Sequence, residues 1–237
     1  MAKNYQILST IYDTYWGSFA QRYSELVLNF IPEKGQITVL DLACGTGSLA
    51  INLARNGFNV KGIDISTEMI EVANLKKNSI KGVEFKVDNM LNPDINRKVD
   101  IITCAFDSVN YLLNSSDVRK MFNSSFELLH PGGRFIFDFN TEKAYRKNNN
   151  FEIRRMVPGG YYDHKMTYNS HKRLAQTIFE FFDGQWELHI QKPYEYKEIT
   201  QILQQVGFEI LFTFNNFKGE PVKQDSDRVF VVAEKPK

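Results

Sequence analysis

The sequence predicts an α/β fold in which a mostly parallel sheet lies between two layers of helices. Apolar runs rich in strand-forming residues alternate with segments whose apolar residues recur at helical spacing, a pattern typical of such sheets. The glycine-rich turn Cys44–Gly47 stands where the first of these runs meets a helical segment. After the fifth run, short runs at hairpin spacing interrupt the alternation and indicate a small antiparallel insertion.

The alternating segments can be bounded from residue type and spacing. A first helix is expected over Ser18–Ile31, where Pro32 closes the apolar pattern. The five core strands are expected over Ile37–Leu42, Asn59–Asp64, Val83–Val87, Val99–Ala105 and Arg134–Phe139. The intervening segments are helices over Ser48–Arg55, from the N-cap Ser66 to about Lys77 and over Asp117–Leu129, and a turn over His130–Gly133. The final elements are a helix over Glu198–Val206 and strands over Glu209–Phe214 and Arg228–Glu234.

The segment Phe151–Gln191 differs from the rest of the chain. Turn sequences separate four runs of strand formers, which predicts an antiparallel meander. Its expected strands are Glu152–Val157, Tyr161–Tyr168, Leu174–Phe182 and Trp186–Ile190, entered through a polar linker over Lys147–Asn150. Alternation along the second strand gives one face, expected to pack on the core or cover a pocket, made of Tyr162, His164, Met166 and Tyr168. The meander histidines His164, His171 and His189 are most simply interpreted as packing or surface residues.

These elements predict one domain over residues 1–237. We expect an N-terminal helical segment over residues 1–34 and a Rossmann-like core over residues 35–147 and 195–237. We expect residues 148–194 to form an antiparallel β lid inserted into that core. Such an insertion emerges at the carboxyl ends of the strands, where ligands bind in open α/β sheets.

The composition limits the classes of partner. Apolar residues make up 43% of the 237 residues, charged residues 24%, and the net charge of +1 gives no overall attraction to nucleic acid or a membrane surface. We recognise neither an apolar run of about 18 residues nor a secretory leader at the N-terminus. The two cysteines, Cys44 and Cys104, indicate neither a disulfide framework nor a metal site. We therefore expect a cytoplasmic protein with no membrane, nucleic-acid or metal partner.

The segment Val39–Gly47 carries the most chemical information. Gly45 and Gly47 stand where a strand turns into a helix, so the backbone can approach a ligand closely and point amide groups at it. Asp64 lies seventeen residues past Gly47, at the end of the second strand, where a carboxylate can accept both hydroxyls of a ribose.

Gly45–Ala50 also fits the G-x-G-x-x-A fingerprint of dinucleotide-binding proteins, which alone is a weak signal. Asp41 argues against a dinucleotide, because its negative charge would oppose a pyrophosphate and would suit a cationic amino-acid ligand. Asp88, after the third strand, can accept from an adenine amino group or can be a solvated strand-end carboxylate. A structural turn without a ligand is the remaining interpretation of the glycine loop.

In order along the chain, five segments resemble the motifs of class I S-adenosylmethionine-dependent methyltransferases: Val39–Gly47, Ile63-Asp64, Val87-Asp88, Asp100–Phe106 and Leu129–Phe139. The resemblance implies a seven-stranded sheet whose last strand is antiparallel, with S-adenosylmethionine as cofactor. The resemblance implies that four residues surround the methionine half of the cofactor: Asp41, Ala43, Gly45 and Gly47. Asp64 would bind the ribose hydroxyls. The adenine would contact Ile65, Met69, Asp88, Asn89 and the following Met90. Ala105 and Phe106 would flank the sulfonium, and Tyr12 or Tyr15 would close over the cofactor.

The insertion after the fifth strand and the segment Tyr194–Phe208 resemble the small-molecule branch of this family. This resemblance implies methyl transfer to N or O of a small molecule by in-line displacement. The candidates for binding the acceptor are Asp107, Tyr111, Tyr162 and His164. Asp107 could orient the acceptor or cap the next turn, and both interpretations stay open.

Two other functions also stay open. The first is a methyltransferase that acts on RNA or protein. The near-zero net charge argues against RNA. The fourth strand is followed by neither Asn-Pro-Pro-Tyr nor Asp-Pro-Pro-Tyr, which argues against methylation of the exocyclic amines of bases. A module that binds the cofactor without turnover would show no methyl transfer to any acceptor. We assign no catalytic base, because a sulfonium methyl is already an activated electrophile and transfer depends mainly on alignment.

Overall fold

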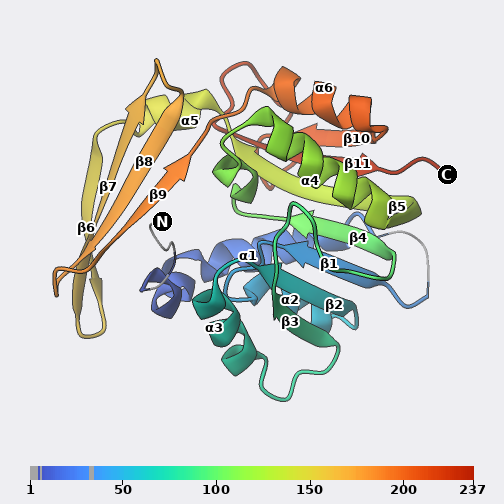
Figure 1. Cartoon of the computed structure of the whole chain (residues 1–237), viewed down its shortest axis with the longest axis horizontal. Coiled ribbons are helices and arrows are strands. Elements are labelled where there is room, and N and C mark those ends of the chain that lie inside the picture. The colour runs from blue at the N-terminus through green and yellow to red at the C-terminus, as the bar shows by residue number, and fades with distance from the viewer. Residues whose placement is uncertain (1–4, 6, 32–34) are drawn as a thin grey trace.

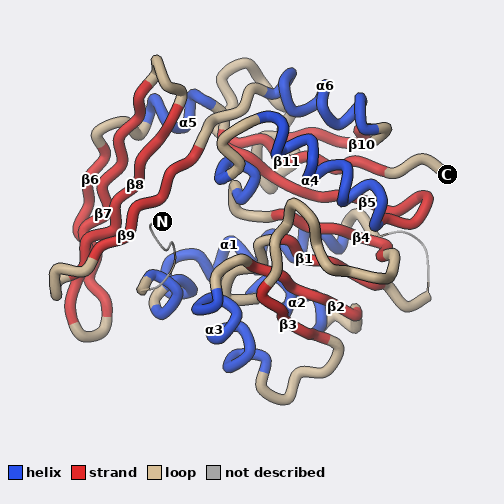
Figure 2. Tube along the Cα trace, viewed as in Figure 1, coloured by secondary structure: helices blue, strands red, loops and turns tan. Residues whose placement is uncertain are grey.

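The computed structural model describes residues 5, 7–31 and 35–237, so Pro32 and the ends of the expected 1–34 segment lie outside the described residues. Two separate sheets organise the chain (Figures 1 and 2). The larger has seven strands in the order β10-β11-β5-β4-β1-β2-β3, and the smaller has four in the order β6-β7-β8-β9. This confirms the predicted fold class, a Rossmann-like sandwich with a small antiparallel sheet.

The larger sheet is parallel apart from β11, which runs antiparallel to both of its neighbours, β10 and β5. Its strands are β1 (Thr38–Leu42), β2 (Asn59–Asp64), β3 (Val83–Val87), β4 (Val99–Cys104), β5 (Leu129–Asn140), β10 (Glu209–Phe214) and β11 (Arg228–Glu234). Every residue of β4 is buried, as expected for a central strand with helices on both faces. Phe135, Phe137 and Phe139 of β5 point to one face and Ile136 to the other, which reflects the two-residue period of a strand.

Helices cover both faces of this sheet. They are α1 (Tyr12–Leu28), α2 (Ser48–Arg55), α3 (Thr67–Lys77), α4 (Ser115–Leu128), α5 (Glu142–Lys147) and α6 (Tyr196–Val206), with short 3₁₀ turns η1 (Leu8–Thr10) and η2 (Ser108–Tyr111). α1 and α2 pack on the face that carries Ile136, and α4 and α6 on the face of the β5 phenylalanines. Ser66 caps α3 as predicted, because its hydroxyl accepts from the backbone N–H of Met69 at 3.1 Å.

The smaller sheet is an antiparallel meander of β6 (Phe151–Val157), β7 (Gly160–Asn169), β8 (Leu174–Phe181) and β9 (Trp186–Gln191). Its inner face packs on η1 and the start of α1, where Tyr162, Phe179 and Phe181 enclose Leu8. Its outer face carries ion pairs such as Arg154–Asp163 at 2.8 Å. Figure 1 shows this sheet standing beside the larger one, with the N-terminal helical elements between them.

Three local predictions were wrong. α1 begins at Tyr12 instead of Ser18, because Tyr12, Trp16 and Phe19 already form an apolar stripe at helical spacing. The expected turn over His130–Gly133 is part of β5, whose pairing with β4 is irregular at this point. Lys147, the first residue of the expected polar linker Lys147–Asn150, is the last residue of helix α5.

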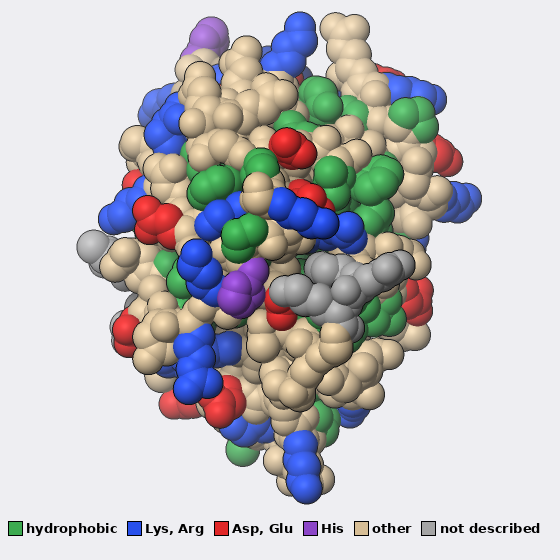
Figure 3. Space-filling view, turned by 90° about the vertical axis from the view of Figure 1, so that its right-hand side faces the viewer, with side chains coloured by type: hydrophobic (Ala, Val, Ile, Leu, Met, Phe, Trp, Pro, Cys, Tyr) green, Lys and Arg blue, Asp and Glu red, His purple; other side chains and the backbone are tan. Residues whose placement is uncertain are grey.

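The surface opposite the smaller sheet has a mixed character. Figure 3 shows Lys and Arg side chains interspersed with Asp, Glu and apolar side chains on this face. Among the residues that the structure describes, no helix has the length and apolar content needed to cross a membrane.

Gly47 is required by packing and by backbone conformation. Its φ is +75°, and a Cβ built on it would stand 2.4 Å from Cζ of Phe85 and 3.0 Å from Cβ of Ala73. This position is the N-cap of α2, so the end of the glycine loop must sit tightly between α3 and β3. The helix N-terminus can therefore reach the end of β1 only with glycine at this position.

We predict that Gly47→Ala lowers the free energy of unfolding by about 2–4 kcal/mol, from backbone strain and from the clash with Phe85. Gly57→Ala is the matched control, because Gly57 has φ +89° and nothing within 4 Å of its built Cβ. The control should show only the backbone cost, about 1–2 kcal/mol. Urea unfolding of both variants measures the difference, and equal losses would contradict the packing argument.

Candidate active site

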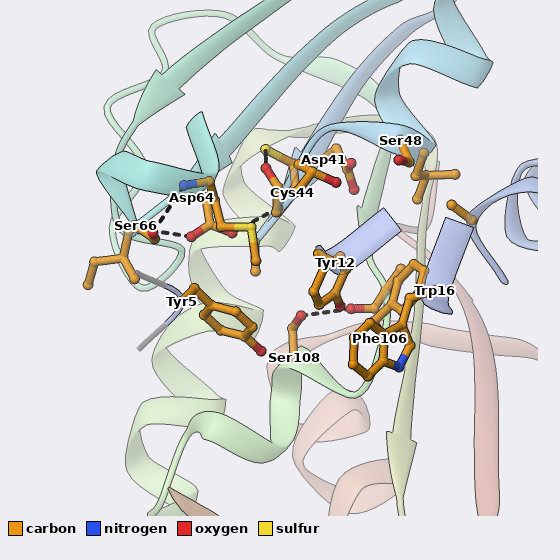
Figure 4. A pocket seen from close by; sticks show the side chains of 18 of the residues that line it. Tyr5, Tyr12, Trp16, Asp41, Cys44, Ser48, Asp64, Ser66, Phe106 and Ser108 are labelled. Carbon is orange, nitrogen blue, oxygen red and sulfur yellow. Dashed lines mark hydrogen bonds between the residues drawn. The ribbon is translucent and has the colours of Figure 1, made fainter. Parts of the chain in front are cut away.

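A cavity of about 480 Å³ opens at the carboxyl ends of β1, β2 and β4. This is the position where ligands bind in open α/β sheets. Its floor is formed by Asp41, the loop from Ala43 to Thr46 and Asp64, and aromatic side chains form the opposite wall (Figure 4). The space is large enough for a nucleoside-sized ligand.

The glycine loop has an unusual backbone. Ala43, Gly45 and Gly47 all have positive φ values, 52°, 55° and 75°. Alternation of left-handed residues with ordinary ones turns successive N–H groups toward one side, a geometry that favours acceptor atoms of a ligand or a carboxylate. Here the N–H of Gly45 donates to Oδ2 of Asp64 at 2.8 Å, so the loop and the end of β2 are locked together.

Asp64 is held rigidly by backbone donors. Its Oδ1 accepts from the N–H of Ser66 at 2.9 Å, in addition to the Gly45 contact on Oδ2. Burial raises the pKa of Asp64, although these backbone hydrogen bonds act in the opposite direction. The carboxylate keeps acceptor capacity beyond these bonds and the side chain lines the cavity, so a ligand with hydroxyl groups can bind here.

Asp41 carries an unsatisfied buried oxygen. Its side chain is 1% exposed, and Oδ1 accepts from the hydroxyl of Thr103 at 2.6 Å. Oδ2 has no hydrogen-bond partner among the residues that the structure describes. Burial, together with the nearby charge of Asp64, raises the pKa of Asp41 to about 7, although the Thr103 hydrogen bond lowers it. A cationic donor in the cavity would satisfy this oxygen and favour its charged form.

Asp13 of α1 ties the N-terminal helix to the glycine loop. Its Oδ1 accepts from the hydroxyls of Thr46 at 2.7 Å and Ser48 at 2.8 Å, and Lys76 of α3 donates to its Oδ2. Lys76 also donates to the hydroxyl of Ser48 at 2.7 Å. The network joins α1, α2 and α3, and it helps to position Tyr12 and Trp16, which lie on either side of Asp13 in α1.

Five aromatic side chains form the wall of the cavity opposite Asp41: Tyr5, Tyr12, Trp16, Phe106 and Tyr111. The rings of Tyr12 and Trp16 stack at 4.8 Å between centroids, and Tyr5 meets Tyr12 edge-on at 6.0 Å. Burial raises the pKa of Tyr12, so its phenol stays protonated. Figure 4 shows Tyr5, Tyr12, Trp16 and Phe106 gathered on one side, with Asp41 and Asp64 facing them.

A second cavity, of about 220 Å³, lies beneath the smaller sheet and shares these five aromatic residues with the first. Its other lining residues come from the N-terminal elements, the core and the meander, and they include the polar or aromatic side chains of Asp107, Asn140, His164, Thr177, Phe179, His189, Gln191 and Arg228. The two cavities therefore meet at one aromatic wall.

Asp107 is fixed by charged and amide partners. Arg228 donates to its Oδ1 at 2.8 Å, and Gln191 of β9 donates to its Oδ2 at 2.7 Å. Phe106 and Asp107 both have positive φ, and their N–H groups donate to the buried carboxylate of Asp138 at 2.8 and 3.0 Å. Burial raises the pKa of Asp138 to about 6 against the lowering effect of Arg228. The Asp107 side chain makes no cap bond to η2, so of the two interpretations the cap is excluded.

The structure brings ten of the predicted cofactor residues to the first cavity: Tyr12, Asp41, Ala43, Gly45, Asp64, Ile65, Met69, Met90, Ala105 and Phe106. Tyr15, Gly47, Asp88 and Asn89 do not line it. Tyr15 donates to the carbonyl of Met156 on β6, and Gly47 packs against Phe85. The carboxylate of Asp88 accepts from the N–H groups of Asn89 and Asp94 at 2.8 and 2.9 Å, which folds the loop after β3.

Of the predicted acceptor residues, Asp107, Tyr111 and His164 line the second cavity. Tyr162 does not; it is fully buried against Leu8 and Phe179. Sequence reasoning missed Tyr5, Trp16, Gln191 and Arg228, and it interpreted His189 as a packing or surface residue although it lines this cavity. The helical spacing of Tyr12, Trp16 and Phe19 was a usable signal for Trp16, whereas the others depend on contacts between distant segments.

Comparison with known proteins identifies the family. A family model described as a methyltransferase domain matches residues 33–207. A protein of Geobacillus sp. (strain WCH70) that carries a methyltransferase name is 33% identical over 235 residues, which cover 93% of this chain and 92% of that protein. The glycine/sarcosine N-methyltransferase of Halorhodospira halochloris is 28% identical over 93% of this chain and 83% of its own length.

A solved structure agrees with this similarity in sequence. The S-adenosylmethionine-dependent methyltransferase from Clostridium acetobutylicum ATCC 824 superposes with a TM-score of 0.84 at 28% identity, over 98% of this chain and 99% of the other. The fold, the position of the cavity and the match to the family model all point to one conclusion. The chain belongs to the methyltransferase domain family and is a class I S-adenosylmethionine-dependent methyltransferase.

Proposed function

We propose that the protein transfers a methyl group from S-adenosylmethionine to N or O of a small molecule by in-line displacement. The observation that carries this proposal is the pair of cavities that meet at the aromatic wall of Tyr5, Tyr12, Trp16, Phe106 and Tyr111. The first cavity would hold the cofactor and the second the acceptor. The methyl group would cross between them at the aromatic wall.

The first cavity has the donors and acceptors that the cofactor needs. The unpartnered Oδ2 of Asp41 would bind the ammonium group of the methionine half, and Asp64 would accept the ribose hydroxyls. Ile65, Met69 and Met90 would enclose the adenine. When bound, the cofactor supplies an electrophilic methyl group on a sulfonium.

The aromatic wall suits a positively charged sulfur. Rings attract cations through their negative faces, by about 0.5–2 kcal/mol each. Ala105 and Phe106 lie at the end of β4, close to Tyr12, whose ring is 6.3 Å from that of Phe106. These side chains would hold the sulfonium and exclude water, so that alignment of the acceptor supplies most of the rate.

The second cavity favours a small acceptor over a macromolecule. It is enclosed by α1, η2 and the inner face of the smaller sheet, and its volume of about 220 Å³ fits a molecule of modest size. The similarity to a glycine/sarcosine N-methyltransferase supports an acceptor with a small amine. We further propose that residues 148–194 act as a lid that selects the acceptor, since β7, β8 and β9 supply His164, Thr177 and Gln191.

We predict that Asp41→Asn changes both the pH dependence of stability and cofactor affinity. The folded pKa of about 7 exceeds the ordinary value of about 3.9, so between these pH values the folded protein holds a proton that the unfolded chain has released. Wild-type stability without cofactor should therefore fall by about 1–3 kcal/mol between pH 5 and pH 8, a loss that the variant lacks.

Urea unfolding at both pH values, with wild type as reference, measures this difference. S-adenosylmethionine affinity of the variant should fall by about 1.5–3 kcal/mol at pH 8, because the ammonium group loses a charged acceptor. If the stability of the variant depends on pH as that of the wild type does, Asp41 is already ionised in the folded wild type at pH 5, and the prediction is wrong.

Asp64→Asn and Asp88→Asn form a second test. Asp64→Asn should weaken cofactor binding by about 1.5–3 kcal/mol, because two hydroxyls lose a charged acceptor. Asp88→Asn should cost less, at most about 1 kcal/mol, since the Asp88 oxygens already accept from two backbone N–H groups. Calorimetric titration with S-adenosylmethionine decides, and equal losses would assign Asp88 to the adenine edge as the sequence predicted.

Thr177→Leu tests the second cavity. Thr177 is buried on the inner face of β8 and lines only the second cavity, whereas its neighbour Gln176 is exposed on the outer face. We expect Thr177→Leu to raise the KM for the acceptor roughly tenfold while leaving cofactor affinity unchanged, because it fills the cavity. Gln176→Leu is the matched control and should change neither value. If Thr177→Leu methylates its acceptor with wild-type KM, the second cavity does not bind the acceptor.

A further inference from the structure

A continuous chain of hydrogen bonds leads from the aromatic wall into the smaller sheet. The hydroxyls of Tyr5 and Tyr111 are 2.6 Å apart, and the Tyr111 hydroxyl is 2.9 Å from Nδ1 of His189. Nε2 of His189 is 3.3 Å from Oε2 of Glu187. Tyr5 and Tyr111 line both cavities, whereas His189 and Glu187 are 2% and 3% exposed on β9.

The buried carboxylate fixes the direction of the chain. Glu187 accepts from the backbone N–H groups of Tyr5 at 3.0 Å and Leu8 at 3.1 Å, and from that of Ile7. Although burial raises the pKa of Glu187, hydrogen bonds from His189 and from the N–H groups of Ile7 and Leu8 hold it below its usual value. Glu187 is therefore an acceptor, and Nε2 of His189 must donate to it.

The remaining donors follow from this assignment. A neutral His189 that donates through Nε2 has a lone pair on Nδ1, so the Tyr111 hydroxyl donates to Nδ1. The Tyr111 oxygen then accepts from the Tyr5 hydroxyl, and the Tyr5 oxygen keeps its acceptor capacity at the junction of the cavities. Burial raises the pKa of both tyrosines, so each phenol carries its proton at neutral pH.

We propose that Tyr5, Tyr111, His189 and Glu187 form a proton relay that takes up the proton leaving the acceptor during methyl transfer. The proposal rests on the proposed function and narrows it to acceptors whose nucleophilic atom has a lone pair and loses a proton as it is methylated, a hydroxyl or a neutral primary or secondary amine. Tyr5 would be the catalytic residue, since it faces the reacting atoms. Tyr111, His189 and Glu187 act through it.

The step balances in atoms and electrons. The lone pair of the acceptor's N or O forms the new bond to the methyl carbon, and the electron pair of the broken C–S bond stays on sulfur. The acceptor's proton passes to the Tyr5 oxygen, the Tyr5 proton to Tyr111, and the Tyr111 proton to Nδ1 of His189. The imidazolium that results is stabilised by the carboxylate of Glu187 at 3.3 Å.

Four titratable groups face His189 among the described residues: Tyr5 from the N-terminal segment, Tyr111 from η2, Glu187 on β9 and His164 from β7. The first three are members of the relay, and His164 does not compete for the proton. The Phe179 ring of β8 packs edge-on against His189 at 5.2 Å. Burial, the charge of Arg155 and the neighbouring His189 lower the pKa of His164 to about 4, so His164 stays neutral above that pH. Asp107, which neighbours Tyr111, is paired with Arg228.

The relay makes a prediction that needs no acceptor. In uniformly ¹⁵N-labelled protein, the ring-nitrogen shifts of His189 at pH 8 should show the neutral tautomer with the proton on Nε2. Tyr111→Phe should shift the Nδ1 resonance and leave Nε2 in place. A proton on Nδ1 would overturn the relay whatever the protein methylates, because Tyr111 would then have no acceptor.

Kinetics complete the test. With an acceptor found by screening small amines and hydroxyl compounds for transfer of labelled methyl, His189→Gln and Tyr111→Phe should each lower kcat by about 10²–10⁴-fold. The double variant should lose no more than either single variant. Both single variants should lose the fall in kcat at acid pH that the wild type shows when the relay is protonated. The cofactor affinity of His189→Gln, whose side chain lines only the second cavity, should be unchanged. His171→Gln, at an exposed hairpin position, is the control.

The outcomes separate the two proposals. Unchanged kcat and pH profile in His189→Gln would overturn the relay while leaving the methyltransferase function intact. A parallel loss of kcat and cofactor affinity, with the pH profile unchanged, would show that His189 only holds the N-terminal segment in place. If the wild type transfers methyl to no compound in the screen although the tautomer is as expected, the small-molecule function fails and the relay fails with it.

Discussion

The buried carboxylate of Glu187 is the contact on which the geometry of the site depends. It lies on the inserted sheet, yet it accepts from three backbone N–H groups of the N-terminal segment. Hydrogen bonds to a charged group are worth about 1.5–3 kcal/mol each, more than a single exposed ion pair. These three hydrogen bonds hold Tyr5 and the start of the N-terminal helices against the smaller sheet. They thereby also position the aromatic wall that separates the two cavities.

Three aspartates lie at or near the carboxyl ends of the strands, where the desolvation of their carboxylates opposes folding. Asp41 and Asp138 are buried and Asp64 is half-buried, and desolvation raises the pKa of each. Asp64 and Asp138 are compensated by backbone N–H groups, so each fixes the backbone of a neighbouring loop. Asp41 is compensated on one oxygen only, and its second oxygen has no hydrogen-bond partner among the residues that the structure describes.

The parallel core could be predicted from the sequence because its signals are local. The bounds of β2, β3, β10, β11 and α2 agree with the sequence-based expectation, since in each segment the apolar residues recur at strand or helix spacing and turn residues or a change of pattern mark the ends. The glycine loop with Asp41 and Asp64 was predicted for the same reason. His189 and Arg228 could not be assigned, because their partners Tyr111 and Asp107 are 78 and 121 residues away in the sequence and approach them only in the folded chain. The adenine contact of Asp88 was predicted from a motif, but in the structure its oxygens accept from backbone N–H groups of its own loop.

The division of the lining residues has a consequence for how such proteins diverge. Apart from the five aromatic side chains, the two cavities have no lining residue in common, and the second takes much of its lining from the inner face of one inserted sheet. Exchanges at alternate positions of β7 and β8 would therefore alter the second cavity, which we propose binds the acceptor, and would leave Asp41, Asp64 and the glycine loop of the first cavity unchanged. One ancestral core could in this way give rise to enzymes of different specificity by mutation of a single hairpin, while the donor site is inherited unchanged.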